Sequence, residues 1–579
     1  MSGRFSSRVA GKCWLAVAAS VLFATAGVTN NAVAQKPVHS ASAHGTTTHG
    51  STAHSTEDVL LKAMKTELAR EKADLVLTGM QRPYFIEYRL DDLTAYEAVA
   101  NYGALTSEEA NHARVVRVIV RVGDYTSDSS TGRGDGSVTL APEDNNPEAL
   151  RYALWIATDT AYKGALRAYA AKQAALKQYQ STRPEHDFAE EKPVAHIGPL
   201  VSLDLDRAEW KRRIIQASGL YATDPTVRGY ANDVQYSTAN IRAIALNRYV
   251  VNTEGTALRQ GYTGYSGMIS VGGQAPDGMQ LSRDNGTTAV DARDLESWPA
   301  FRKRVIDDIE SFEALRKAPL VSADDYHGPV LMSGDAASDV FSHLFMPNIL
   351  GTRPAMGTTA RTNGAYAASY KSRVLPDFLS VTDNPLEAKY AGHALMGAYT
   401  IDDEGVPAQT VNVAVNGTLE NYLIGREPIR DFPASNGHGR AAPGGDAHPS
   451  SSVLVVKSSQ PLSPEELNKR LLSMAKDQGH DVYYVQTLGG PFQPRVLYLV
   501  HADGTRQLVR GAAFDELDTR SLRSDIIAAG NDPFVSQSLG AVPSTTIAPS
   551  LLFDDIGIKR ATEEQQKLPY YPPPALPEK

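Results

Sequence analysis

The chain has 579 residues, of which 42% are apolar and 21% charged, and this composition excludes a wholly disordered, collagen-like or disulfide-built protein. At roughly 100 to 200 residues per domain, the length predicts two to four domains. The formal net charge of −9 argues against nucleic acid as a partner, because phosphate backbones are bound by clustered cations.

The first 34 residues have the organisation of a cleavable secretory signal. Three cations precede an apolar run from Trp14 to Val28, and the small residues Ala32-Val33-Ala34 follow it. We therefore predict a signal peptide at residues 1–34 and a periplasmic or secreted mature protein. No later window offers the roughly 20 apolar residues of a membrane helix, so no membrane span is expected. The single cysteine, Cys13, lies inside the signal, so the mature chain can form neither a disulfide nor a thiolate metal site.

Residues 35–55 are rich in His, Ser and Thr. Such a segment cannot bury enough apolar surface to become ordered, and it is predicted to be a disordered linker. Its four histidines are spaced five residues apart and offer a second interpretation, weak capture of Zn²⁺ or Cu²⁺.

Residues 56–321 are predicted to form an N-terminal α+β domain. Pro83 to Leu90 and Val115 to Val122 are β-rich and should pair in a sheet, and Ala243 to Val251 adds a further strand. Apolar spacing and capping residues predict helices starting near Ser55, at Pro147 (to about Gln180), over Asp206 to Ala217 and over Leu295 to Lys317.

Residues 322–560 consist of short apolar runs separated by Gly, Asp and Asn, which predicts a C-terminal, mainly antiparallel β domain with few helices. One helix is well marked, from the cap at Ser463 to Gly479. Ala502-Asp503-Gly504 predicts a hairpin turn. Residues 561–579 are a Pro-rich tail. The predicted fold class is thus α+β.

Most catalytic motifs are missing from the sequence. Gly264-Tyr265-Ser266-Gly267 is one glycine short of a nucleophile elbow, and the sequence contains no Walker loop, Gly-x-Gly-x-x-Gly or His-Glu-x-x-His. The acidic run Asp402-Asp403-Glu404-Gly405 could hold a cation or fix a turn. Considered alone it favours the turn, because Asp side chains accept hydrogen bonds from their own backbone there.

At this stretch the sequence resembles the TldD/PmbA family, which contains zinc metallopeptidases and partner subunits that lack zinc. The resemblance continues through three later motifs in the family's order. These are Asn416-Gly417-Thr418-Leu419-Glu420-Asn421-Tyr422-Leu423, Asn436-Gly437-His438-Gly439-Arg440 and Pro449-Ser450-Ser451.

In catalytic members the resemblance implies a helix with His-Glu-x-x-x-His, in which two imidazoles bind zinc, the glutamate activates water, and a cysteine near the C-terminus is the third ligand. The matching segment here begins with Ser338-Asp339 and ends with His343. Only His343 keeps its ligand type, and Asp339 takes the place of the glutamate. Other ligands would have to come from unproven substitutes such as His393, Asp403 or His438.

We therefore expect an exported protein of peptide or protein turnover, the zinc-deficient subunit of a heteromeric peptidase whose partner is a paralogue with an intact zinc motif. If the metal site is lost, no cofactor is expected. If the site is remodelled instead, the expected cofactor is zinc. The resemblance implies a chamber for extended peptides, and we expect its lip at residues contributed by two loops: Asp402, Asp403, Glu404, Gly405, His438 and Arg440. The alternatives are an active metallopeptidase that uses Asp339 and His343 in a remodelled metal site, and a non-catalytic peptide-binding envelope protein.

Overall fold

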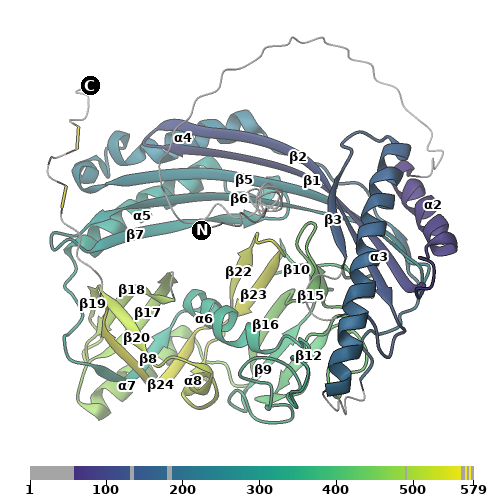
Figure 1. Cartoon of the computed structure of the whole chain (residues 1–579). Coiled ribbons are helices and arrows are strands. Elements are labelled where there is room, and N and C mark those ends of the chain that lie inside the picture. Colours follow the sequence, from purple (N-terminus) through teal and green to yellow (C-terminus); the bar gives the residue numbers. More distant parts are fainter. Residues whose placement is uncertain are drawn as a thin grey trace, which may run out of the picture. The chain divides into compact units, whose positions relative to one another are not determined.

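A computed structural model of the chain describes residues 58–130, 136–178, 185–489 and 492–562, together with residues 568, 569, 571, 573 and 574. The predicted signal peptide (1–34), the predicted linker (35–55) and most of the predicted tail (561–579) lie outside the described residues. From Val59 onward the chain forms one compact unit (Figure 1). None of the helices in the described ranges is long and apolar enough to cross a membrane.

The N-terminal region is built on a seven-stranded sheet with the order β3-β2-β1-β5-β6-β4, in which β7 pairs with β6. Its long strands form two antiparallel hairpins, β1–β2 and β5–β6. The strands are β1 (Pro83–Asn101), β2 (Ala104–Val122), β3 (Ser137–Ala141), β4 (Ala195–Ile197), β5 (Tyr236–Asn252), β6 (Ala257–Gln274) and β7 (Gln280–Ala289).

The β1–β2 hairpin turns over two residues, Tyr102 and Gly103, which have φ angles of 53° and 83°. Positive φ at both central residues matches the twist of the strands they join. The register runs from Asn101 opposite Ala104 to Pro83 opposite Val122, so the predicted pairing of these two segments is confirmed.

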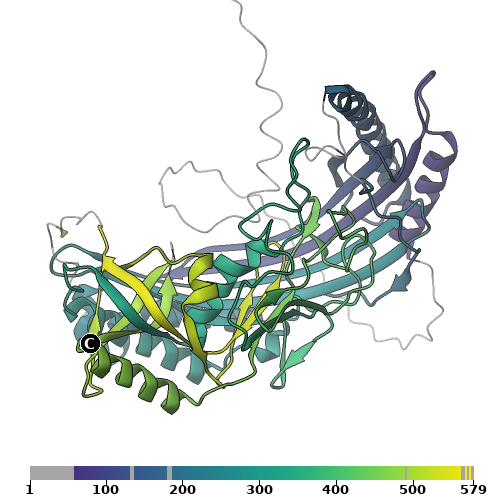
Figure 2. The same cartoon turned by 90° about the horizontal axis from the view of Figure 1, so that it is seen from below.

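Four helices cover one face of this sheet. α2 (Val59–Asp74) and α3 (Pro147–Gln178) pack on Ile86, Tyr88 and Leu90 of β1, whereas α4 (Arg207–Thr223) and α5 (Trp298–Lys317) pack further along the same face. Side chains alternate between the two faces of a strand, so Phe85, Glu87, Arg89 and Asp91 point to the opposite face. The C-terminal region covers that opposite face (Figure 2).

The C-terminal region has two larger sheets that share one apolar core. The first has the order β13-β12-β9-β16-β23-β22, and its strands are β9 (Leu379–Asp383), β12 (Val411–Val415), β13 (Thr418–Leu419), β16 (Val453–Ser458), β22 (Phe534–Ser538) and β23 (Ser544–Ala548). The second has the order β19-β18-β17-β8-β24-β20, with β21 against β24. Its strands are β8 (Tyr326–Met332), β17 (Val482–Gly489), β18 (Gln493–Val500), β19 (Arg506–Val509), β20 (Ala512–Asp515), β21 (Ile526–Ala529) and β24 (Leu551–Arg560).

Short elements complete this region. Two small hairpins are formed by β10 (Lys389–Tyr390) with β11 (His393–Ala394) and by β14 (Gly439–Ala441) with β15 (Ala447–Pro449). The helices are α6 (Gly334–Val340), α7 (Pro464–Gln478) and α8 (Thr519–Ser524). α7 has the predicted capping box at Ser463 and ends at Gly479 in the left-handed conformation.

The predicted α+β class is confirmed, with helices and a sheet first and a mostly stranded region after them. One detail differs from the expectation of antiparallel strands, because β16 pairs with β23 and β17 pairs with β8 in parallel. In both pairs the strands are far apart in the sequence, so no hairpin signal could reveal them.

Candidate functional site

α6 carries Ser338 and Asp339 of the segment that the resemblance would match to a zinc-binding helix. It starts at Ser333, whose hydroxyl accepts a hydrogen bond from the Ala336 N–H, and its side chains fill the space between the two sheets. Ser338 is fully buried, and its hydroxyl donates to the carbonyl oxygen of Gly334 at 2.8 Å. The serine at the position of the first histidine therefore makes a helix-internal contact.

Asp339 and His343 lie on the outer side of this segment, where α6 continues into a π-helical turn at Phe341–Phe345. The His343 ring is exposed and lies against Phe492. Its Nδ1 donates to the carbonyl oxygen of Asp339 at 2.8 Å, which leaves Nε2 as the acceptor nitrogen. Burial raises the pKa of Asp339, while the nearby His343 works against that rise.

Asp335 lies one turn before Asp339 and adds a second carboxylate to this face. Burial and the charge of Asp339 raise the pKa of Asp335 to about 6. Arg283 of β7 partly offsets both effects on Asp335. The face therefore combines two carboxyl groups that hold protons more strongly than usual with one exposed imidazole.

These donors do not fit the zinc site that the family implies. A catalytic zinc takes three protein ligands, and the serine at the first position points away from His343 into the helix and the core. Within the described part of the chain, no group of three or more His, Cys, Asp or Glu side chains is placed to hold a metal ion.

The acidic run forms a tight turn that Asp402 organises. The Gly405 N–H donates to the Asp402 carbonyl oxygen at 3.2 Å, and Gly405 has a φ of 81°. The Asp402 carboxylate accepts hydrogen bonds from the N–H groups of Glu404, Val406 and Gly439 at 2.8 to 3.0 Å. Asp402 and Gly405 therefore fix the turn, as the residue types indicate.

Asp403, in contrast, points to the N-terminal sheet and holds two arginines. Its Oδ2 lies 2.7 Å from Arg248 Nη1 and 2.9 Å from Arg440 Nε, and it also accepts the Ala441 N–H at 2.8 Å. Burial alone would raise the pKa of Asp403, but the two guanidinium groups and this N–H hold it well below its usual range. Arg248 also makes a two-point contact with Asp91, at 2.5 and 3.0 Å.

The turn at residues 442–446 joins the same contact between the sheet and the C-terminal region. Arg89 and Arg117 donate to the carbonyl oxygens of Gly445 and Gly444, and Arg117 also pairs with Asp446. A Cβ atom at Gly444, which has a φ of 67°, would meet Val115 at 2.7 Å. The turn is thus half-buried against the sheet, and Arg440 and His438, which precede it, are buried.

His438 belongs to a separate buried cluster. Its Nδ1 is 3.0 Å from the Asn436 carbonyl oxygen, and its Nε2 is 3.4 Å from Asp383 Oδ1. Asp383 also accepts the hydroxyl groups of Ser451 and Ser452. Both serines therefore contact the carboxylate rather than the imidazole. In a catalytic triad the serine hydroxyl contacts the imidazole, so this cluster has a structural role.

Glu404 lies in a third cluster, with Arg426. Its Oε2 accepts the Arg426 N–H at 2.7 Å, and the Arg426 guanidinium pairs with Glu254 Oε1 at 2.5 Å. Arg426 and Arg121 both contact the ring of Phe188 at 4.1 Å from its centroid. The segment after residue 184 is thereby held between the sheet and the C-terminal region.

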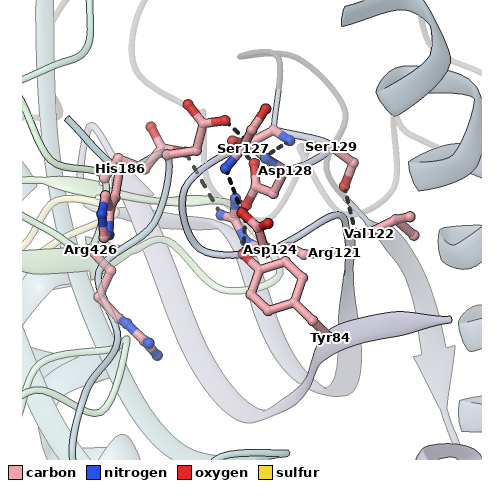
Figure 3. Close-up of polar contacts among 12 residues, drawn as sticks. Tyr84, Arg121, Val122, Asp124, Ser127, Asp128, Ser129, His186 and Arg426 are labelled. Atoms are coloured by element: carbon pink, nitrogen blue, oxygen red, sulfur yellow. Dashed lines mark hydrogen bonds and ion pairs between the residues drawn. The ribbon is translucent and has the colours of Figure 1, made fainter. Parts of the chain in front are cut away.

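The loop after β2 completes this contact (Figure 3). Tyr84 and Arg121 point toward the fully buried Asp128 and donate to its Oδ2 at 2.8 and 3.0 Å. Asp187 accepts the Asp128 N–H and pairs with Arg353 of the C-terminal region at 2.7 Å. Ion pairs that are buried or partly buried thus connect the loop after β2 to the sheet and to the C-terminal region.

Sequence reasoning did not identify Arg89, Asp91, Arg248 and Arg426. The available signal was the placement of Glu87, Arg89 and Asp91 at every second position of one strand, with apolar residues between them. Such alternation by itself indicates a solvent-exposed face. The structure instead buries that face.

Glu404→Gln is expected to change how stability depends on pH. Burial raises the pKa of Glu404 from its ordinary 4.5 to about 7, so the folded state binds more protons than the unfolded state between these values. The wild type should therefore lose stability as the pH rises from about 4.5 through 7. We expect the variant to be more stable than the wild type by about 1–3 kcal/mol at pH 8 and to match it at pH 4.5.

Urea unfolding at both pH values measures this effect, and Glu310→Gln on the exposed side of α5 is the matched control. A variant that is less stable than the wild type at pH 8 would show that ionised Glu404 is stabilised in the fold.

The sequence and the fold were compared with those of known proteins. Residues 325–560 match the family model for the PmbA/TldA metallopeptidase C-terminal domain. No curated protein matches the sequence.

Three solved structures are similar over most of the chain. A candidate modulator of a DNA gyrase from Thermotoga maritima has a TM-score of 0.59 and 18% identity, covering 86% of this chain and 99% of that one. TldE from Thermococcus kodakarensis has a TM-score of 0.57 and 13% identity, covering 86% and 100%. A candidate modulator of DNA gyrase from Bacteroides thetaiotaomicron has a TM-score of 0.56 and 12% identity, covering 87% and 98%. At these identities the likeness shows the fold.

Proposed function

We propose that this chain, whose residues 325–560 match the PmbA/TldA metallopeptidase C-terminal domain, is the zinc-deficient subunit of an exported heteromeric peptidase of the TldD/PmbA type. Peptide or unfolded protein would be the substrate of the assembly, and the partner would be a paralogue with an intact His-Glu-x-x-x-His. The signal-like sequence of residues 1–34 supports export.

The observation that carries this proposal is the state of Ser338. Its side chain is fully buried and bonded within its own helix, so His343 is the only imidazole among the three positions that would bind zinc and activate water. A single exposed imidazole does not hold zinc tightly. Asp339 has a shorter side chain than glutamate, and the mature sequence contains no cysteine for the third position.

We expect purified protein starting at residue 56, without the histidine-rich linker, to retain less than about 0.1 zinc per chain after loading with zinc and dialysis. Inductively coupled plasma mass spectrometry measures this content, and His343→Ala should leave it unchanged. About one retained zinc per chain that is lost in His343→Ala would contradict the proposal and support a remodelled metallopeptidase.

A second arm of this test concerns the partner. The protein with its own signal should co-purify from the periplasm with a paralogue that carries the intact motif, and peptide hydrolysis should require that paralogue. A lone monomer that binds peptides without hydrolysing them would favour the non-catalytic envelope protein instead.

A further inference from the structure

A cavity of about 270 Å³ lies where the N-terminal sheet meets the C-terminal region. One side is formed by β5 and β6, including Leu246 and Tyr262, and the other by residues 395–400 and Pro543. Ligand sites are typically concave, mostly apolar and supplied with a few polar groups. This cavity has that character, and its volume suits one amino-acid residue rather than a long peptide.

The charged end of the cavity is formed by Arg248, Arg440 and Asp403. The donors of Arg248 are directed to Asp91, Asp403 and two carbonyl oxygens. Arg440 is 7% exposed and uses Nε on Asp403, and its guanidinium lies 4.0 Å above the ring of Tyr399. Its buried Nη1 has no hydrogen-bond partner among the described residues.

Two guanidinium groups meet two carboxylates here, because Asp91 also pairs with Arg248. The charge of Arg248 is thus used within the protein, whereas Nη1 of Arg440 keeps a donor without a partner among the described residues. Burial raises the pKa of the neighbouring Tyr262 to about 12, while Arg248 and Arg440 act against this rise and Asp403 and Asp91 add to it. An unpaired buried guanidinium donor is costly and is satisfied best by a carboxylate oxygen.

We infer that this cavity binds the free carboxylate of a single apolar residue, with the carboxylate on Arg440 and the side chain against Leu246, Leu395 and Met396. This inference rests on the proposed role in peptide recognition, because the same chemistry is presented by the C-terminal residue of a peptide. A free amino-acid derivative would present it as well, and the test distinguishes the two sources.

Isothermal titration calorimetry of the mature chain compares four probes: N-acetyl-leucine, its amide, a pentapeptide that ends in leucine with a free carboxylate, and the same pentapeptide amidated. Each free acid is expected to bind at least about tenfold more tightly than its amide, because a charge-assisted hydrogen bond is lost in the amide. Arg440→Lys is expected to reduce this preference, because lysine lacks the planar fork.

Arg440→Lys also disturbs the contact with Asp403, so Ala398→Phe provides an independent variant. Ala398 lines the cavity and lies outside the charged cluster, and a phenyl ring there should fill the space and abolish binding of the acids. Ala368→Phe, in an exposed loop, is the matched control and should bind as the wild type does.

Equal binding of pentapeptide acid and amide would overturn the carboxylate site and leave peptide recognition standing. Binding of N-acetyl-leucine without either pentapeptide would keep the carboxylate site and count against the proposed function. No acid binding, or acid binding unchanged in Ala398→Phe, would overturn the inference.

Discussion

Asp403→Asn is expected to lower the free energy of unfolding by about 3–5 kcal/mol at pH 7, because the change leaves two buried guanidinium groups without their shared carboxylate. Arg248 is 3% exposed and Arg440 is 7% exposed, so water cannot replace the lost charge. The oxygen of the Asn side chain can still accept hydrogen bonds, but it supplies no negative charge. Urea unfolding followed by circular dichroism measures the loss.

The pH dependence distinguishes this electrostatic effect from a packing defect. The folded pKa of Asp403 lies below its ordinary value, so its contribution to stability is complete above about pH 4 and is lost as the pH falls toward the folded pKa. The difference between wild type and variant should therefore stay constant from pH 5 to 8 and shrink below pH 4. A difference that persists unchanged at acid pH would indicate packing instead.

Asp431→Asn is the matched control for this change. Asp431 pairs with Arg361 at 2.7 Å, but its side chain is 49% exposed. Exposed pairs contribute less than about 1 kcal/mol. A control that loses as much stability as Asp403→Asn would contradict the argument from burial.

The elements that the sequence predicted correctly are those whose signals are local. Ser463 with Glu466 and Gly479 mark both ends of α7, and Pro147 marks the start of α3, because caps act within one turn of the helix. The apolar spacing that follows Leu60 likewise predicts α2. α8 has a cap at Asp518, but its six residues are too few to show an apolar period, and it was not predicted.

The contacts between the two regions could not be predicted in this way. Arg248 meets Asp403 across 155 positions of sequence, and the fold alone brings them together. The charged residues of β1 have the pattern of a solvent-exposed strand, but the 442–446 turn lies over Arg89 and Asp91 and helps to bury that face. The local pattern of apolar and charged residues in β1 does not indicate where a turn more than 350 residues later will lie.

The candidate zinc segment shows a third kind of limit. The resemblance aligns Ser338 with a histidine, and so predicts that the ligand type has changed. It does not establish where the serine points, because the start of α6 at Gly334 and the π-helical turn after Val340 set that direction. The burial of Ser338 and the exposure of His343 are consequences of that helix geometry.

Arg426→Met is expected to destabilise the fold by about 3 kcal/mol, because it removes the positive charge beside Glu254 while keeping an unbranched side chain against Phe188. Arg426 is 1% exposed and also donates to the carbonyl oxygen of Ala189 at 2.6 Å. The variant therefore removes a hydrogen-bond donor from both Glu254 and this carbonyl oxygen. Tyr125 still donates to Glu254 at 2.8 Å, which limits the loss.

A double-mutant cycle with Glu254→Gln tests whether this loss is the loss of an ion pair. If the pair is the cause, Arg426→Met should cost at least about 1 kcal/mol less in the Glu254→Gln background than in the wild type, because no buried charge is then left unpaired. If Arg426 acts only through packing on Phe188, the two changes should add. Additivity would therefore show that packing, and not the ion pair, accounts for the stability that Arg426 contributes. The segment after residue 184 would then be held by the packing of Phe188.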